Sequence, residues 1–206
     1  MQRLLAAASI VLGVLSGCRA NEEQRVAKLL ETNPTPAQFS ICHGNSCRLR
    51  TDVSLSTDEW ARIGALFDPA PADALAERRQ IARAIGLLET FTGRQADTLD
   101  DAAGMGVHWN RDGQLDCIDE ATNSTTYLRM MAADRLIRFH DIGFPANRFV
   151  ITAWGPSNTA TIKETATGKP YAVESYFRNN GEPAYVLPLD VWTAGWVPED
   201  GPPPDV

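Results

Sequence analysis

The hydrophobic period of the chain changes near residue 134, and this change limits the folds that the chain can adopt. Before that point, apolar residues recur at helical spacing. From Leu136 onward, short runs of β-branched and aromatic residues alternate with turns that contain Gly and Pro. Helical segments followed by a series of strands are typical of α+β domains with an antiparallel sheet. We therefore expect N-terminal helices, a core helix and then such a sheet.

Two helices are expected in the first half of the chain. Ser56 and Glu59 have the spacing of a capping box, in which each side chain bonds the backbone amide of the other residue. The second helix is expected over residues 72–91, because its apolar residues share one face, and Thr92-Gly93 should end it. A glycine-rich extended loop should follow.

A third helix is expected from Cys117 to about Ala133. Asp116 is a favourable N-cap residue, and Asp119 lies at the third helical position. The strands expected after it cover residues 136–142, 148–154, 158–164 and 171–177. The aromatic-rich stretch from Arg178 to Trp196 is expected to pack on this sheet as a lid or belt.

The N-terminus has the pattern of an export signal. Arg3 precedes an apolar run, Leu4–Leu15, that is too short to span a bilayer. The following run Leu-Ser-Gly-Cys18 resembles a bacterial lipobox, which implies that Cys18 carries lipid and anchors the protein in a membrane. Arg19 favours the outer over the inner membrane, with the protein facing the periplasm. The alternative is an ordinary secretory signal and a secreted protein.

Four segments are expected on this basis. Residues 1–17 form the signal peptide, residues 18–37 the lipidated cysteine and its tether, residues 38–197 a single α+β domain, and residues 198–206 a Pro-rich disordered tail. The central segment is long enough to bury a core of its own.

The charge of the chain excludes some partners. The formal net charge is −7, and removal of residues 1–17 leaves 18 basic and 26 acidic residues, a net charge of −8. The sequence has no basic patch, so nucleic acid is not an expected partner. A peptide or protein partner is compatible with the charge.

The remaining cysteines are expected to differ in their state. Cys42 and Cys47 flank a tight His-Gly-Asn-Ser turn, and a disulfide between them would fix a hairpin of residues 39–42 and 47–53. Cys117 is then unpaired. The alternative pairs Cys117 with Cys42 or Cys47 and leaves the other one free.

The position of Cys117 has two opposing consequences for its thiol. The dipole and free amides at a helix start favour a thiolate. The carboxylates of Asp116, Asp119 and Glu120 disfavour a further negative charge. The sequence alone does not fix the direction of the net change in the pKa of the thiol.

The run from Gly113 to Ala121, followed by a helix and then strands, resembles the nucleophile region of the transglutaminase-like cysteine peptidases. The resemblance covers residues 105–178 and implies a papain-like core. It implies that Cys117 is the nucleophile of an amide hydrolase or acyltransferase, and that Glu174 is the orienting carboxylate. The expected histidine is missing, and Asn158 stands near its place.

Two histidines are candidates for the base that the motif lacks. His140 lies on the first expected strand after the core helix, and His108 lies in the glycine-rich loop before Cys117. His43 is expected to be a turn residue. We find no metal-ligand spacing and expect no cofactor. The alternative is that Cys117 is a buried, inert thiol and that the protein is a non-catalytic envelope lipoprotein that binds a peptide or protein.

Overall fold

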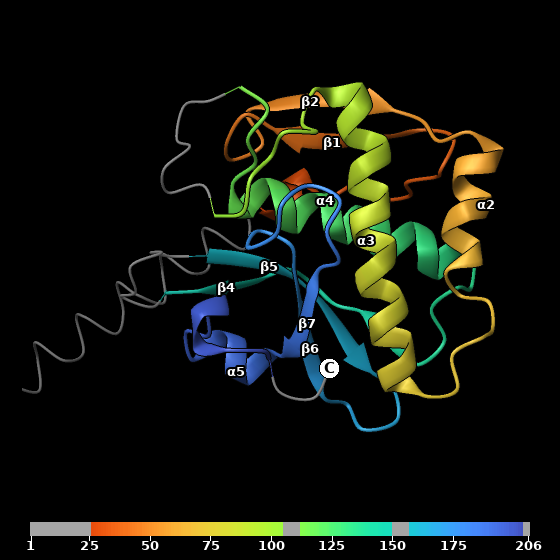
Figure 1. Cartoon of the computed structure of the whole chain (residues 1–206), viewed down its shortest axis with the longest axis vertical. Helices are drawn as coiled ribbons and strands as arrows, with labels where there is room; N and C mark the ends of the chain where they lie inside the picture. The colour runs from red at the N-terminus through yellow and green to blue at the C-terminus, as the bar shows by residue number, and fades with distance from the viewer. Residues whose placement is uncertain (1–25, 105–111, 150–156, 204–206) are drawn as a thin grey trace, which may run out of the picture.

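The structure is a computed structural model that describes residues 26–104, 112–149 and 157–203. Its helices are α2 (Thr57–Ala65), α3 (Ala74–Ala96), α4 (Cys117–Ala133) and the short α5 (Leu189–Thr193). Its strands are β1 (Phe39–His43), β2 (Leu49–Val53), β3 (His140–Ile142), β4 (Ala146–Arg148), β5 (Ser157–Glu164), β6 (Pro170–Glu174) and β7 (Tyr185–Pro188). In Figure 1, α4 lies between the β1–β2 hairpin and the larger sheet, and α2 and α3 cover one side.

The larger sheet is antiparallel throughout, so the expected α+β class is confirmed. Its strand order is β3-β5-β6-β7, and β4 also pairs with β5. The expectation for the stretch after Arg178 needs correction, because Tyr185–Pro188 joins the sheet as β7 and only the segment after it covers a face. Buried residues at Val186 and Leu187 explain the pairing, since they extend the core on both faces of the sheet.

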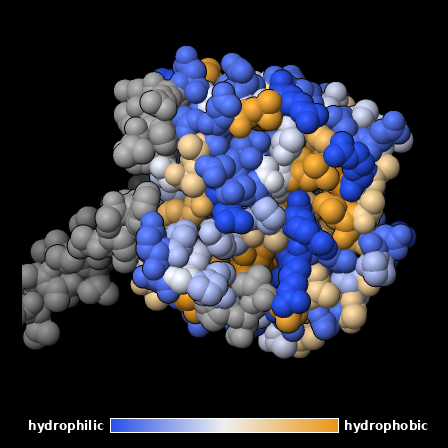
Figure 2. All heavy atoms as spheres, viewed as in Figure 1, coloured by the Kyte–Doolittle hydropathy of each residue, from blue (hydrophilic) through white to orange (hydrophobic). Residues whose placement is uncertain are grey.

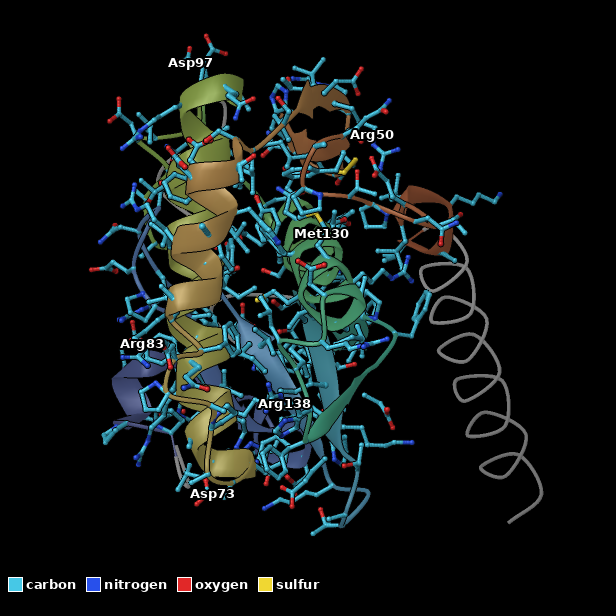
Figure 3. All side chains as sticks on the ribbon, turned by 90° about the vertical axis from the view of Figure 1, so that its right-hand side faces the viewer. Arg50, Asp73, Arg83, Asp97, Met130 and Arg138 are labelled. Carbon is cyan, nitrogen blue, oxygen red and sulfur yellow. A yellow bond between two sulfur atoms is a disulfide. The ribbon has the colours of Figure 1, made fainter. Side chains whose placement is uncertain are left out.

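The predicted starts of the helices agree with the structure, but the predicted end of the second helix does not. The capping box of Ser56 and Glu59 is present at the start of α2. Helix α3 continues past Gly93 to Ala96 and is followed by the C-cap residue Asp97, which adopts a left-handed conformation with φ of 58°. Gly93 is tolerated inside the helix because a Cβ there would lie 3.1 Å from Asn180 Nδ2, so the absent side chain permits a close approach. Figure 3 shows α3 between Asp73 and Asp97, with Arg83 on the helix.

Helix α4 is buried on nearly every side because it packs between the hairpin and the sheet. Its polar side chains bond within the helix, to the hairpin and to residues beside the sheet. The hydroxyl of Thr125 donates to the carbonyl of Ala121 at 2.7 Å. The side-chain amide of Asn123 bonds both backbone groups of Cys42, at 2.7 and 2.9 Å. The buried polar side chains of this run are thus mostly hydrogen bonded, but the hydroxyl of Thr122 has no hydrogen-bond partner.

The sheet separates two apolar clusters. The larger one lies between the sheet, α3 and α4, and it includes Ala160 and Val173. The smaller one lies on the opposite face and consists of Ala172, Phe177, Leu187, Trp192 and Trp196. Trp192 and Trp196 are thus core residues. On the molecular face in Figure 2, hydrophilic residues form a band along α3, with apolar residues beside it.

Part of the expected tether contacts the domain. The side chain of Val26 is buried, and the carboxylate of Glu31 accepts from the Ser40 amide at 2.7 Å. The guanidinium of Arg129 also donates to the carbonyl of Glu31. Within the expected tail, Pro198–Asp200 form one 3₁₀ turn. Cys18 and the rest of the export signal lie outside the described residues, among which no helix has the length and apolar character needed to cross a membrane.

Candidate functional site

Cys117 is the first residue of α4, as the sequence predicts. The carboxylate of Asp116 accepts from the amides of Ile118 and Asp119, at 3.0 and 2.9 Å. The carboxylate of Asp119 accepts from the Asp116 amide at 3.2 Å, which completes the capping box. Two carboxylates therefore use the helix-start amides beside Cys117.

The sulfur of Cys117 faces an amide from the sheet. Asn158 Nδ2 lies 3.8 Å from Cys117 Sγ and donates to it. Asn147, the partner of Asn158 in the β4–β5 register, donates its own Nδ2 to Asn158 Oδ1 at 3.3 Å. This second bond fixes the direction of the Asn158 amide, because its oxygen is engaged by Asn147 and its NH₂ group must point toward the sulfur.

The pKa of the Cys117 thiol is raised to about 11. Burial is the main cause, and the nearby charges of Asp116 and Glu174 act in the same direction, whereas hydrogen bonds from Asn158 act against it. A thiol with this pKa is almost entirely protonated at pH 7. Burial and the neighbouring carboxylates therefore outweigh the interactions that favour the thiolate.

Glu174 lies near Cys117, but it belongs to the other face of the sheet. Side chains alternate along β6, so Glu174 shares a face with Ala172 and the smaller apolar cluster. Its carboxylate accepts from Trp192 Nε1 and from the Tyr176 amide, the latter at 3.1 Å. Burial raises its pKa to about 7, although the bond from Trp192 lowers it. In the described part of the chain, no hydrogen bond joins Glu174 to Asn158.

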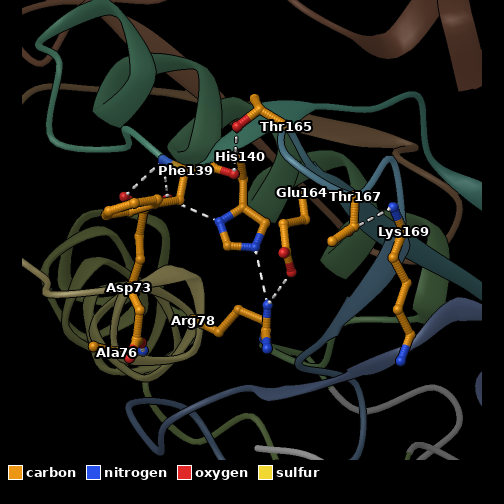
Figure 4. Close-up of polar contacts among 10 residues, drawn as sticks. Asp73, Ala76, Arg78, Phe139, His140, Glu164, Thr165, Thr167 and Lys169 are labelled. Carbon is orange, nitrogen blue, oxygen red and sulfur yellow. Dashed lines mark hydrogen bonds and ion pairs between the residues drawn. The ribbon is translucent and has the colours of Figure 1, made fainter.

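His140 lies at the far end of β5 from Asn158. It pairs with Glu164, which is six residues beyond Asn158, a separation of roughly 20 Å along a strand. Figure 4 shows the polar contacts of His140 there. Its Nδ1 lies 2.8 Å from Glu77 Oε1, and its Nε2 lies 3.3 Å from Arg78 Nη1. The structure therefore does not place this candidate base beside Cys117.

The reason for the position of His140 is a buried polar network. Glu77 is fully buried and also accepts from the amides of Arg138 and Phe139. Because Arg78 can only donate, His140 Nε2 must accept, and Nδ1–H must then donate to Glu77. His140 thus completes a structural network that joins α3 to β3.

Neither of the other two histidines is hydrogen bonded to Cys117 in the described part of the structure. His108 lies outside the described residues. His43 Nε2 lies 2.9 Å from Thr51 Oγ1 in the β1–β2 hairpin, and partial burial lowers its pKa. Asn158 is therefore the described polar side chain that contacts the sulfur.

The predicted Cys42–Cys47 disulfide is present, and its loop contacts the site. The amides of Asn45 and Cys47 donate to the carboxylate of Asp119, at 3.0 and 2.6 Å. The amide of Ser46 donates to Asp116 at 2.7 Å. The positive φ angles of these three loop residues direct successive amides to one side, as in an anion-binding nest. The loop thus stabilises the acidic start of α4.

A buried carboxyl network lies behind the helix start. Ser175 Oγ donates to Glu120, and the side chains of Asp101 and Glu120 are hydrogen bonded. Burial and the neighbouring Glu120 raise the pKa of Asp101 to about 9, and burial raises the pKa of Glu120 to about 7. The pKa of Glu89 is also raised well above its ordinary value, mainly by burial. We infer that these groups share protons near neutral pH. Among the described residues, no group of three or more His, Cys, Asp or Glu side chains could hold a metal ion.

Sequence reasoning missed Arg148, the last residue of β4. Its side chain is 1% exposed and stacks over the Trp192 ring at 4.5 Å. Burial lowers its pKa, while the charges of Glu174 and Cys117 act against this change. The sequence carries no local signal for this placement, because it depends on the register of β4 with β5.

Comparison of the chain with protein-family models, with curated proteins and with solved structures finds no match. The candidate site is therefore interpreted from its own chemistry.

Proposed function

We propose that the protein is an exported lipoprotein with a degenerate transglutaminase-like domain that binds a peptide or protein partner and does not cleave it. The observation that carries the proposal is the contact between Cys117 and Asn158. A side-chain amide does not accept the thiol proton at neutral pH, and it does not protonate a leaving group. Among the described residues, the arrangement keeps a thiol at the nucleophile position and places no base beside it.

The raised pKa of the Cys117 thiol supports this proposal. A cysteine nucleophile works as a thiolate, and its pKa is usually lowered by a nearby imidazolium or helix start. Here burial and Asp116 raise it to about 11. A protonated, partly exposed thiol is suited to contacting a ligand without reacting with it.

The export part of the proposal is supported by the lipobox-like run before Cys18 and by the disulfide, which is compatible with an oxidising envelope compartment. Metabolic labelling with a radioactive fatty acid in a bacterial host tests it. We expect label on the full chain and none on Cys18→Ser. Equal label on both proteins would contradict lipidation at Cys18.

Alkylation of Cys117 tests the proposal that this residue is not a catalytic nucleophile. The protein is purified without reductant as residues 19–206, treated with iodoacetamide from pH 6 to pH 11, and analysed by peptide mass mapping. We expect the rate at Cys117 to rise about tenfold per pH unit up to about pH 10 and less steeply toward pH 11, because only the thiolate reacts. A rate that levels off below pH 8 would show an activated thiol and would overturn the proposal.

A further inference from the structure

The guanidinium of Arg148 is held in a fixed position by hydrogen bonds from only one of its nitrogen atoms. Its Nη1 donates to the carbonyl oxygens of Trp192 and Trp196, at 2.7 and 2.8 Å. The stack on the Trp192 ring fixes the plane of the group. Both contacts are made by the segment after β7, which covers the sheet face opposite to α4. The guanidinium is therefore positioned before any ligand arrives.

The other edge of this guanidinium has no partner. Its Nε and Nη2 are buried and make no hydrogen bond in the structure. These two N–H groups lie on the same side of the planar group and can donate in parallel to the two oxygens of one carboxylate. No carboxylate of the described residues forms an ion pair with Arg148 within 4.0 Å.

A second unpartnered donor lies opposite Arg148. Ser157 is its partner in the β4–β5 register, so the two side chains leave the sheet on the same face. The Ser157 side chain is 1% exposed, and its Oγ has no hydrogen-bond partner in the structure. The pair therefore presents three unused donor groups in one place.

Leaving these groups unpaired is unfavourable. A buried polar group without a partner destabilises the fold, and a charged one does so more strongly. Glu174 interacts electrostatically with Arg148, but its carboxylate is already bonded by Trp192 Nε1 and the Tyr176 amide. The unpaired edge is thus suited to an anionic group that comes from a ligand.

We propose that the unpaired edge of Arg148, with the hydroxyl of Ser157, is a subsite for a carboxylate of the bound peptide, which local movement of the covering segment would admit. This inference rests on the proposed function. Arg148 leaves the sheet on the face opposite to α4, and it still interacts electrostatically with Cys117, so the subsite lies within electrostatic range of the candidate site. A planar carboxylate fits two parallel donors, and Glu174, whose charge also acts on Arg148, would repel a phosphate dianion more strongly than a singly charged carboxylate.

Two matched peptides test the subsite. Acetyl-Ala-Ala with a free C-terminal carboxylate and the same peptide with a C-terminal amide are titrated into ¹⁵N-labelled protein (residues 19–206). The Arg148 Nε–H resonance is assigned by its loss in Arg148→Lys. We expect a saturable shift of this resonance with the acid, and binding of the amide that is about tenfold weaker or absent, because one charge-assisted pair is lost.

Variants separate the subsite from general effects. Arg148→Lys keeps the charge but cannot donate in the bidentate manner, so the acid should bind about tenfold more weakly to it. Ser157→Ala should weaken binding of the acid several-fold. Arg138→Lys, at an exposed arginine beyond the far end of the sheet, is the matched control and should bind as the unaltered protein does.

Each outcome decides one of the two proposals. Equal binding of acid and amide, unchanged binding of the acid to Arg148→Lys, or no binding of either peptide would overturn the carboxylate subsite. Equal binding of both peptides without reaction leaves the proposed function in place. Cleavage of the peptide, or a covalent adduct on Cys117, would overturn the proposed function and leave the subsite standing.

Discussion

The Nδ2 atom of Asn158 lies 3.8 Å from the sulfur of Cys117, on the sheet face that packs against α4. A cysteine hydrolase needs a proton acceptor at this contact, and an amide does not provide one. The oxygen of the same amide is engaged by Asn147. The amide thus donates to the sulfur without accepting the thiol proton, and the thiol stays protonated because burial and the neighbouring carboxylates outweigh this hydrogen bond.

Replacing Asn158 with histidine should activate the thiol. We expect Asn158→His to lower the apparent pKa of Cys117 by about 1–3 units, because an imidazolium within hydrogen-bond distance stabilises the thiolate. The rate of iodoacetamide alkylation between pH 6 and pH 11 measures this pKa. At pH 7.5 the alkylation rate should rise at least about tenfold.

Asn158→Ala is the control for this change. It removes the amide hydrogen bonds that lower the pKa of the thiol, so the pKa should stay high or rise further. An equal increase in alkylation for the Ala and His variants would mean that greater exposure of the sulfur, and not the imidazole, accounts for the result.

The Cys42–Cys47 disulfide should stabilise the start of α4. We expect the double variant Cys42→Ser, Cys47→Ser to lose about 2 kcal/mol of unfolding free energy, as loop-closure entropy predicts for so short a loop. Amide hydrogen exchange should become faster at Asn45, Ser46 and Cys47, which donate to Asp116 and Asp119. Urea unfolding and exchange mass spectrometry measure the two effects.

Exchange in α2 serves as an internal control, because α2 is capped by its own Ser56 and Glu59. If protection decreases equally in α2 and in the loop, the disulfide stabilises the whole domain and has no special effect on the helix start.

Local signals in the sequence predicted much of the fold. The capping boxes at Ser56 and Asp116 fixed two helix starts correctly, because a cap is a short-range pattern of side chains. The spacing of Cys42 and Cys47 likewise predicted the hairpin and the disulfide. The predicted end of α3 at Thr92-Gly93 was wrong. Gly93 lies inside the helix, where its lack of a side chain allows Asn180 to pack closely against it.

The site was less predictable, because it depends on strand register. The sequence placed Asn158 near Cys117, and the structure brings the two together. His140 was a candidate base because it lies on the first strand expected after the core helix. The antiparallel register puts His140 opposite Glu164, at the far end of β5. The position of Arg148 could not be predicted, because it depends on the register of β4 with β5. A slip of one residue would move its side chain to the other face of the sheet.

The buried carboxyl network should make the protein less stable as the pH rises. Asp101 and Glu120 have raised pKa values of about 9 and about 7 in the folded protein, so they keep protons that the unfolded chain releases above its ordinary pKa of about 4. The unfolded state then binds fewer protons, and the unfolding free energy falls between about pH 4 and pH 9 by about 1.4 kcal/mol per pH unit for each retained proton. Urea unfolding at pH 5, 7 and 9 measures the slope.

Glu120→Gln separates this network from other titrating groups. The amide is nearly isosteric with the protonated acid and does not titrate, so the variant should lose stability less steeply than the unaltered protein between pH 5 and pH 7. Identical slopes for the two proteins would contradict proton retention at Glu120. Asp58→Asn, at an exposed position in α2, should leave the slope unchanged.

His140→Ala should destabilise the fold without changing the chemistry of Cys117. The variant leaves the buried Glu77 without its bond from Nδ1 and opens a cavity, so we expect a loss of about 3 kcal/mol in unfolding free energy. The pKa of Cys117 from alkylation should be unchanged, because His140 lies at the opposite end of β5 from Asn158. His140→Gln, which can still donate to Glu77, should recover part of the stability. A higher Cys117 pKa in both variants, with little loss of stability, would instead identify His140 as the thiol's base.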